Sequence, residues 1–219
     1  MSTATAPRSR HAERAERTRR SILDAATRCF AADGYTSVSM DAIAREAHAT
    51  KPTVYAHFGS KEGLFEALLR SALEQLIETP VSAANTSEQV EQALIDHATQ
   101  QIDMMLDETV LGLLRAASSE GTRRPEWARQ LISSLGTSEF EIWLDGVRQQ
   151  GLLAFDSAAD AAEQFWALIK GALFYPVVIG VRAVPTPAER RRVISGSVRT
   201  FLAAYAIEAS GRTGDSACK

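Results

Sequence analysis

Apolar residues recur at helical spacing along almost the whole chain, and no stretch shows the alternation typical of a β-strand. Ile22, Ala26 and Phe30 follow one another every four residues, and Asp33-Gly34 then supplies a residue suited to end a helix. These patterns predict an all-α fold of about nine helices. We expect them near residues 11–32, 40–47, 51–58, 61–79, 87–106, 108–119, 124–150, 157–179 and 187–208.

The segment from Ser39 to Lys61 is predicted to form two short helices joined by a tight turn at His48-Ala49. Ser39 is a suitable N-cap for the first helix, and either Thr50 or Lys51 for the second. The second helix is polar, rich in hydroxyl groups and flanked by cations. Two helices in this order are the layout that places a helix in the major groove of DNA.

The distribution of charge agrees with that interpretation. The whole chain has a formal net charge of −3, which by itself argues against binding to nucleic acid. Residues 1–61, however, contain 10 Lys and Arg against 6 Asp and Glu, a net of +4, and the remainder contains 14 against 21, a net of −7. A phosphate backbone is attracted to the first part and repelled by the second.

Other classes of protein find little support in the sequence. There is no phosphate-binding GxxxxGK[ST] loop, no GxGxxG fingerprint and no GxSxG motif, so we expect neither an enzyme nor a cofactor. Cys29 and Cys218 are far apart and predict no disulfide framework or metal site. Lys170 and Pro176 interrupt the longest apolar run, which is too short to span a membrane. We expect a cytoplasmic protein that makes no contact with a membrane.

Residues 11–65 resemble the N-terminal domain of the TetR (tetracycline-repressor) family of bacterial transcription regulators. The resemblance rests on Ile22-Leu23-Asp24-Ala25-Ala26, Phe30-Ala31-Ala32-Asp33-Gly34-Tyr35, Ser39-Met40-Asp41-Ala42-Ile43-Ala44 and the segment Lys51–Glu62. It implies an all-helical, Ω-shaped homodimer with one recognition helix per subunit and a body that binds a small molecule. His48 stands where the family usually has Gly, and a positive φ there costs more for His. Further along, Phe165–Gly171 with Phe174-Tyr175-Pro176 is similar to AefR-like members.

The resemblance implies a set of DNA contacts, some to phosphates and some to base edges. Carried over position by position, the set comprises Thr36, Ser39, Thr50, Lys51, Thr53, Tyr55, His57 and Lys61. The alternative is that these side chains form an ordinary solvated helix face. A second pair of alternatives concerns the nearby arginines, which form either a flexible arm that reaches an adjacent groove or a solubilising charged helix. They are Arg14, Arg17, Arg19 and Arg20.

The helices predicted near 157–179 and 187–208 are apolar on more than one side, as expected of helices that bury two faces. One face can meet its own subunit and the other a second copy. The predicted dimer interface consists of Phe165, Ile169, Leu173, Ile194, Val198, Phe201 and Tyr205.

The remaining space among the helices is predicted to hold an apolar effector pocket. Its candidate lining residues are Met104, Met105, Leu111, Arg115, Trp143, Trp166 and Phe174. Methionine adapts to irregular ligands, and Arg115 could pair with an anionic one. His97 has no histidine or carboxylate at metal-binding spacing, so we predict a structural or surface role for it.

The sequence therefore predicts a basic tail (1–10), a helix-turn-helix domain (11–60), a ligand-binding and dimerisation domain (61–209) and a frayed tail (210–219). The predicted function is a transcription regulator, a repressor released from a palindromic double-stranded DNA operator by a small, largely apolar effector. Two alternatives stay open. The regulator could act as an activator or without a ligand, or the chain could be a helical adaptor for other proteins.

Overall fold

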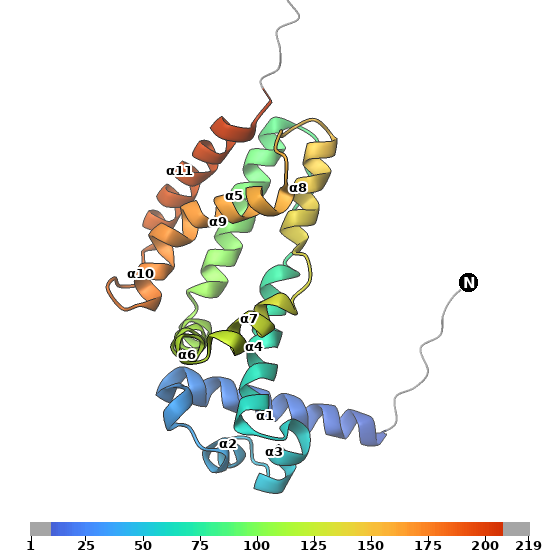
Figure 1. The fold of residues 1–219 in the computed structure, drawn as a ribbon, viewed down its shortest axis with the longest axis vertical. Coiled ribbons are helices and arrows are strands. Elements are labelled where there is room, and N and C mark those ends of the chain that lie inside the picture. Colours follow the sequence, from blue (N-terminus) through green and yellow to red (C-terminus); the bar gives the residue numbers. More distant parts are fainter. Residues whose placement is uncertain (1–9, 208–219) are drawn as a thin grey trace, which may run out of the picture. The chain divides into compact units, whose positions relative to one another are not determined.

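The computed structural model describes residues 10–207, and Figure 1 shows their arrangement as helices. Within that range there is no β-sheet, and one isolated bridge joins Leu153 to Ala206. The predicted all-α class is confirmed. The two predicted tails lie outside the described residues, apart from Arg10. The helices are α1 (Arg10–Ser37), α2 (Met40–Glu46), α3 (Lys51–Phe58), α4 (Lys61–Ile77), α5 (Ser87–Met105), α6 (Glu108–Arg123), α7 (Pro125–Ser133), α8 (Glu139–Gln149), α9 (Ala158–Leu173), α10 (Tyr175–Val178) and α11 (Pro187–Tyr205).

The predicted helix count of nine was slightly low, because two predicted helices are each divided. The first breaks between Ser133 and Glu139, where Gly136 lies among hydroxyl residues and Ser138 caps a new helix. The second breaks at Phe174, after which the single turn of α10 begins at Tyr175 with Pro176 in its first positions. The predicted end of the first helix is confirmed, because Gly34 leaves helical geometry with a φ of 73°.

The chain forms two compact units. The first unit contains α1 to α3, α4 as far as Leu76, and the segment Met105–Gly136 with α6 and α7. The second contains Ile77–Met104 with α5, and the described residues from Thr137 to Ile207. By packing, therefore, α4, α6 and α7 belong to the same unit as the N-terminal helices. The division predicted at residue 60 was of another kind, because it separated the expected DNA-binding part from the expected ligand-binding part. The functional division stays a prediction.

The core of the first unit is built on α1. Ile22 and Phe30 are fully buried and pack in one cluster with Phe65 of α4 and Leu113 of α6. Gly112 allows α6 to approach α1 closely, since a Cβ atom there would lie only 2.7 Å from the carbonyl oxygen of Ala31. This packing fixes the end of α1, from which the chain continues into α2 and α3.

The core of the second unit is aromatic. Phe165 of α9 lies 5.0 Å from Phe140 of α8 and 5.2 Å from Phe201 of α11, measured between ring centroids. All three rings are buried. α11 begins with a capping box, in which the Thr186 hydroxyl accepts from the N–H of Glu189 and the Glu189 carboxylate accepts from the N–H of Thr186. Within residues 10–207, no helix is both long and apolar enough to cross a membrane.

Candidate DNA-binding interface and effector site

Two capping hydroxyls fix the starts of the helices that are predicted to meet DNA. At α2 the Ser39 hydroxyl accepts a hydrogen bond from the N–H of Ala42 over 3.1 Å. At α3 the Thr50 hydroxyl accepts from the N–H of Thr53 over 3.3 Å. Such caps satisfy N–H groups that have no partner within the helix. Thr50 rather than Lys51 is therefore the cap of α3.

His48 forms the turn between α2 and α3 in the left-handed conformation, with a φ of 51°. It is the one non-glycine residue with a positive φ in the part of the chain that the structure describes. Its N–H donates to the carbonyl oxygen of Arg45, and the N–H of Ala49 donates to that of Ala44. L-amino acids adopt this conformation at a cost that achiral Gly does not have. The predicted turn is confirmed, and its strain falls on His48.

α3 has one buried side and one open side. Val54 is fully buried, whereas Lys51 is exposed and Tyr55 retains 42% of its accessible surface. His57 is half-buried, with its ring centroid 6.1 Å from that of Phe58. The open side of α3 is thus available to a macromolecule as large as DNA, while His57 is at its edge.

Lys51 is paired in the free protein. Its Nζ donates to Oδ2 of Asp41 in α2 over 3.0 Å, and this hydrogen bond raises the pKa of Lys51. Both side chains are more than half exposed, so the pair is weak and can exchange partners. The Thr50 and Thr53 hydroxyl oxygens are 2.7 Å apart. A phosphate oxygen near the start of α3 would compete with Asp41 for the ammonium group.

Thr36 lies exposed near the end of α1, where side chains from two other helices contact it. Lys61 Nζ donates to its carbonyl oxygen over 3.3 Å and lies 4.6 Å from the ring centroid of Tyr35. Arg123 Nη1, at the end of α6, donates to its hydroxyl oxygen over 3.2 Å. The structure therefore brings together the predicted contacts Thr36 and Lys61. It adds Arg123, which no local sequence pattern could reveal because it is 87 residues away from Thr36 in the chain.

The four arginines considered as an arm all belong to α1. Arg14, Arg17 and Arg20 are exposed, and the guanidinium carbon of Arg19 lies 5.4 Å from the ring centroid of Phe58. A flexible arm at these positions is therefore wrong. They lie in a charged helix, and its role in solubility alone stays a prediction.

The seven residues predicted to line an effector pocket are divided between the two compact units. The second unit contains Met104, Trp143, Trp166 and Phe174, and the first contains Met105, Leu111 and Arg115. Trp143 Nε1 donates to the carbonyl oxygen of Ser82 over 2.9 Å, so part of this set has a structural role. A pocket lined by these residues stays a prediction.

Two residues that sequence reasoning did not select lie beside Trp166. His97 of α5 is 3% exposed and stacks on Phe140, with a centroid distance of 4.9 Å and an angle of 11° between the rings. Its centroid is 5.7 Å from that of Trp166. Lys170 Nζ lies 4.8 Å from the same indole centroid. In the sequence these residues were one isolated histidine and one lysine in an apolar run, with no motif to connect them.

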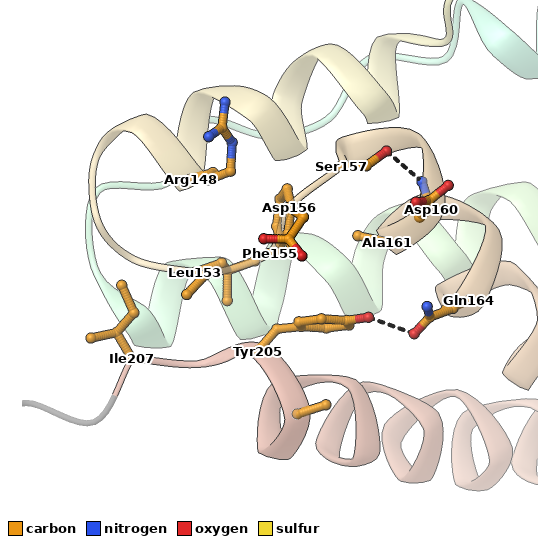
Figure 2. Close-up of a pocket in the computed structure, with 12 residues that line it drawn as sticks. Arg148, Leu153, Phe155, Asp156, Ser157, Asp160, Ala161, Gln164, Tyr205 and Ile207 are labelled. Atoms are coloured by element: carbon orange, nitrogen blue, oxygen red, sulfur yellow. Dashed lines mark hydrogen bonds between the residues drawn. The ribbon is translucent and has the colours of Figure 1, made fainter.

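A surface cavity of about 680 Å³ opens elsewhere in the second unit (Figure 2). It lies among the end of α8, the start of α9 and the end of α11, and none of the predicted effector residues lines it. Figure 2 shows the Tyr205 hydroxyl directed at Gln164, and Phe155 lies nearly perpendicular to the Tyr205 ring at 5.8 Å. The Asp156 and Asp160 carboxylates and the Arg148 guanidinium also border this cavity.

The predicted dimer interface needs correction. Six of its seven residues are at most 2% exposed and fill the core of a single subunit, namely Phe165, Ile169, Leu173, Ile194, Val198 and Phe201. The seventh, Tyr205, is half-buried beside the cavity. The segment predicted as one helix near 157–179 does have exposed apolar residues, but they are other residues than those predicted. Leu168 of α9 is 41% exposed and Tyr175 of α10 is 54% exposed.

Comparison with known proteins identifies families and relatives that the sequence resembles. Residues 22–68 match the bacterial regulatory proteins of the tetR family, and residues 92–207 match the C-terminal domain of AefR-like transcriptional repressors. The HTH-type transcriptional regulator BetI of Agrobacterium fabrum is 34% identical over 161 residues, which cover 70% of this chain and 73% of that protein.

Solved structures agree with the relationship in sequence. A TetR family transcriptional regulator from Pseudomonas syringae pathovar tomato has a TM-score of 0.70 at 29% identity, over 86% of this chain and 97% of that one. The flavonoid-responsive regulator FrrA has a TM-score of 0.67 at 29% identity, over 89% of this chain and 100% of that one. These relatives are transcription regulators and not enzymes. The chain belongs to the TetR family of helix-turn-helix transcription regulators, which bind DNA.

Proposed function

We propose that this regulator is a repressor, and that a small, largely apolar molecule releases it from its operator by binding to the C-terminal domain. The match of residues 92–207 to AefR-like repressors supports repression. The flavonoid-responsive relative supports an organic effector. The observation that most directly supports DNA binding is the exposed side of α3. The Thr50 cap and the buried Val54 fix that helix in place.

The proposed DNA contacts divide by position. Lys51, Thr53, Tyr55 and His57 belong to α3 and are the candidates for base edges and the phosphates next to them. Ser39, Thr50, Thr36 and Lys61 lie at helix ends or beside them, where hydroxyl, N–H and ammonium groups suit phosphate oxygens. Most of these contacts would position the protein, and few would read sequence.

The proposed assembly is a homodimer formed through the outer faces of α9 and α10. Leu168 and Tyr175 offer exposed apolar surface there, next to the small residues Ala167 and Gly171, which allow two helices to approach closely. Two identical copies present two recognition helices. They suit half-sites about 34–36 Å apart on one side of the duplex, so the operator should be close to a palindrome.

Release follows if the effector binds the DNA-competent conformation less tightly than another one. Such coupling typically amounts to about 1–3 kcal/mol, which corresponds to a change of about 5- to 150-fold in DNA affinity. The effector needs no contact with DNA. It needs only a difference in affinity between the two conformations.

The test is a gel-shift titration of the purified protein on the DNA upstream of its own gene, with an unrelated duplex of equal length as competitor. We expect a salt-sensitive, sequence-selective complex, and light scattering should give a dimer. Tyr55→Ala should weaken the complex while leaving the circular dichroism spectrum unchanged. Absence of a selective complex would overturn the regulator mechanism, and a monomer in solution would overturn the dimer. A compound that stabilises the protein but never releases DNA would overturn the effector mechanism.

A further inference from the structure

The imidazole of His97 is buried without a well-formed hydrogen bond. It is 3% exposed, and neither Nδ1 nor Nε2 makes a hydrogen bond of normal geometry. Burial is the larger effect and lowers the pKa of His97 to about 4, while an interaction with the backbone of Pro80 opposes that shift. At neutral pH the ring is therefore uncharged, with one N–H donor and one acceptor. Buried polar atoms in native proteins usually have a partner, so these two atoms require an explanation.

A second polar group, without an ionic partner among the described residues, is the Lys170 ammonium group. It lies against the indole of Trp166, which is also next to His97. Lys170 is one turn beyond Trp166 on α9, and its Nζ lies 4.8 Å from the Trp166 ring centroid. Burial lowers the pKa of Lys170, and no neighbouring carboxylate opposes that shift. None of the ion pairs among residues 10–207 includes Lys170. A partly desolvated ammonium group without an anion is costly, even when an aromatic ring offsets part of that cost.

Packing alone does not explain why a histidine is at position 97 and a lysine at position 170. A leucine or methionine at position 170 would fill the same space beside Trp166 without removing a charge from water. A phenylalanine at position 97 would stack on Phe140 without burying two ring nitrogens that lack a well-formed hydrogen bond. Both positions thus have groups suited to a bound molecule rather than to the core itself.

We propose that α5, α8 and α9 of the second unit hold the effector site, and that the effector is a planar aromatic molecule with one carboxylate or equivalent anionic group. The anion pairs with the Lys170 ammonium group, and the aromatic part stacks on the Trp166 indole. A hydroxyl or carbonyl group on the effector completes the hydrogen bonding of His97. Trp166 and Lys170 are half-buried, whereas His97 and Phe140 are buried, so the effector reaches the cluster from the α9 side.

This inference rests on the proposed function, because it names the chemistry of the effector that the repressor would bind. It also narrows the predicted pocket. Trp166 keeps its predicted role, and His97 and Lys170 replace Arg115, which belongs to the other compact unit, as its polar groups.

The test uses the full-length protein with two matched probes, 1-naphthoate and its neutral analogue 1-naphthamide. Binding is measured by thermal shift and by the change in tryptophan fluorescence. We expect 1-naphthoate to stabilise the wild type, and to bind Lys170→Met at least tenfold more weakly. Lys170→Arg, which keeps the charge, should retain most of the binding. His97→Phe should weaken binding of the hydroxylated probe 3-hydroxy-2-naphthoate more than that of 1-naphthoate. Unchanged circular dichroism of each variant is the control for folding.

The inference is overturned if 1-naphthamide binds the wild type as tightly as 1-naphthoate does, if Lys170→Met binds 1-naphthoate as tightly as the wild type does, or if neither carboxylate binds. An independent titration with upstream DNA separates this failure from failure of the proposed function. A protein that binds the carboxylates through Lys170 but shows no selective DNA complex would refute the proposed function and leave the effector site supported. A protein that binds DNA selectively but binds neither carboxylate would refute only the effector class.

Discussion

Arg123 at the end of α6 donates a hydrogen bond from Nη1 to the hydroxyl oxygen of Thr36, over 3.2 Å. The carbonyl oxygen of Thr36 accepts a second hydrogen bond from Lys61 at the start of α4, over 3.3 Å. The end of α1 is thus tied to α4 and α6 at one residue. The Thr36 hydroxyl accepts from Arg123, so its own hydrogen is free to be donated to a phosphate oxygen.

Arg123→Ala should therefore weaken binding to operator DNA by roughly 0.5–1.5 kcal/mol, the usual contribution of one hydrogen bond. The substitution frees Thr36 to rotate away from the phosphate. Fluorescence anisotropy of labelled operator measures the effect, and Arg129→Ala on α7 is the matched control at an exposed arginine. In a Thr36→Val background, removal of Arg123 should have no further effect. Equal losses in both backgrounds would show that Arg123 acts independently of Thr36.

The close approach of α6 to α1 gives a prediction for Gly112. In Gly112→Ala the new methyl group would lie 2.7 Å from the carbonyl oxygen of Ala31 and 2.9 Å from its Cα atom, so backbone must move. We expect a loss of about 1–3 kcal/mol in stability, measured by urea unfolding. Gly146→Ala in α8 is the matched control, since nothing lies within 4 Å of its new methyl group. That control should gain about 0.5–1 kcal/mol from helix propensity. Equal behaviour of the two variants would contradict the close packing of α6 on α1.

The left-handed turn at His48 predicts a ranking of substitutions. His48→Val should destabilise the protein by about 1 kcal/mol or more, because a β-branched residue fits a φ of 51° poorly. His48→Gly should not destabilise it, because relief of strain offsets the greater freedom of the unfolded chain. Thermal unfolding of the three proteins checks the order. A His48→Val variant as stable as the wild type would show that the turn has another conformation.

The buried His97 predicts a pH dependence of stability. In the unfolded chain His97 takes up a proton near its ordinary pKa of 6.5, whereas the folded protein binds that proton only near pH 4. The unfolded state is therefore favoured as pH falls from 6.5 to 4, by an amount on the order of 3 kcal/mol at most. His97→Phe lacks this contribution. The difference in unfolding free energy between variant and wild type should grow in favour of the variant over this range. A difference that does not change with pH would refute burial of the neutral ring.

Local features of the fold were readable from the sequence, while features that depend on distant contacts were not. Ser39, Gly34 and His48 were placed correctly because caps and turns depend on neighbouring residues. Phe165 and Ile169 were assigned to a dimer interface because periodicity identifies apolar faces but does not say which face packs within the subunit.

The candidate site shows the same limit. The helices predicted to meet DNA, and the open side of α3, followed from one contiguous segment. Arg123, His97 and Lys170 become informative only through neighbours on other helices or through burial. The break between α7 and α8 was also missed, because one glycine among hydroxyl residues can lie within a helix or end it.

The most direct test of the central claim is the salt dependence of operator binding by the wild type and by Lys51→Ala. If α3 lies against DNA in both subunits of a dimer, Lys51 neutralises two phosphates in each complex. The slope of log Kd against log salt should then be less steep by about 1.8 in the variant, and affinity should fall at low salt. The control Arg129→Ala should keep the slope of the wild type. Identical slopes and affinities for Lys51→Ala and the wild type would contradict the assignment of α3 as the recognition helix.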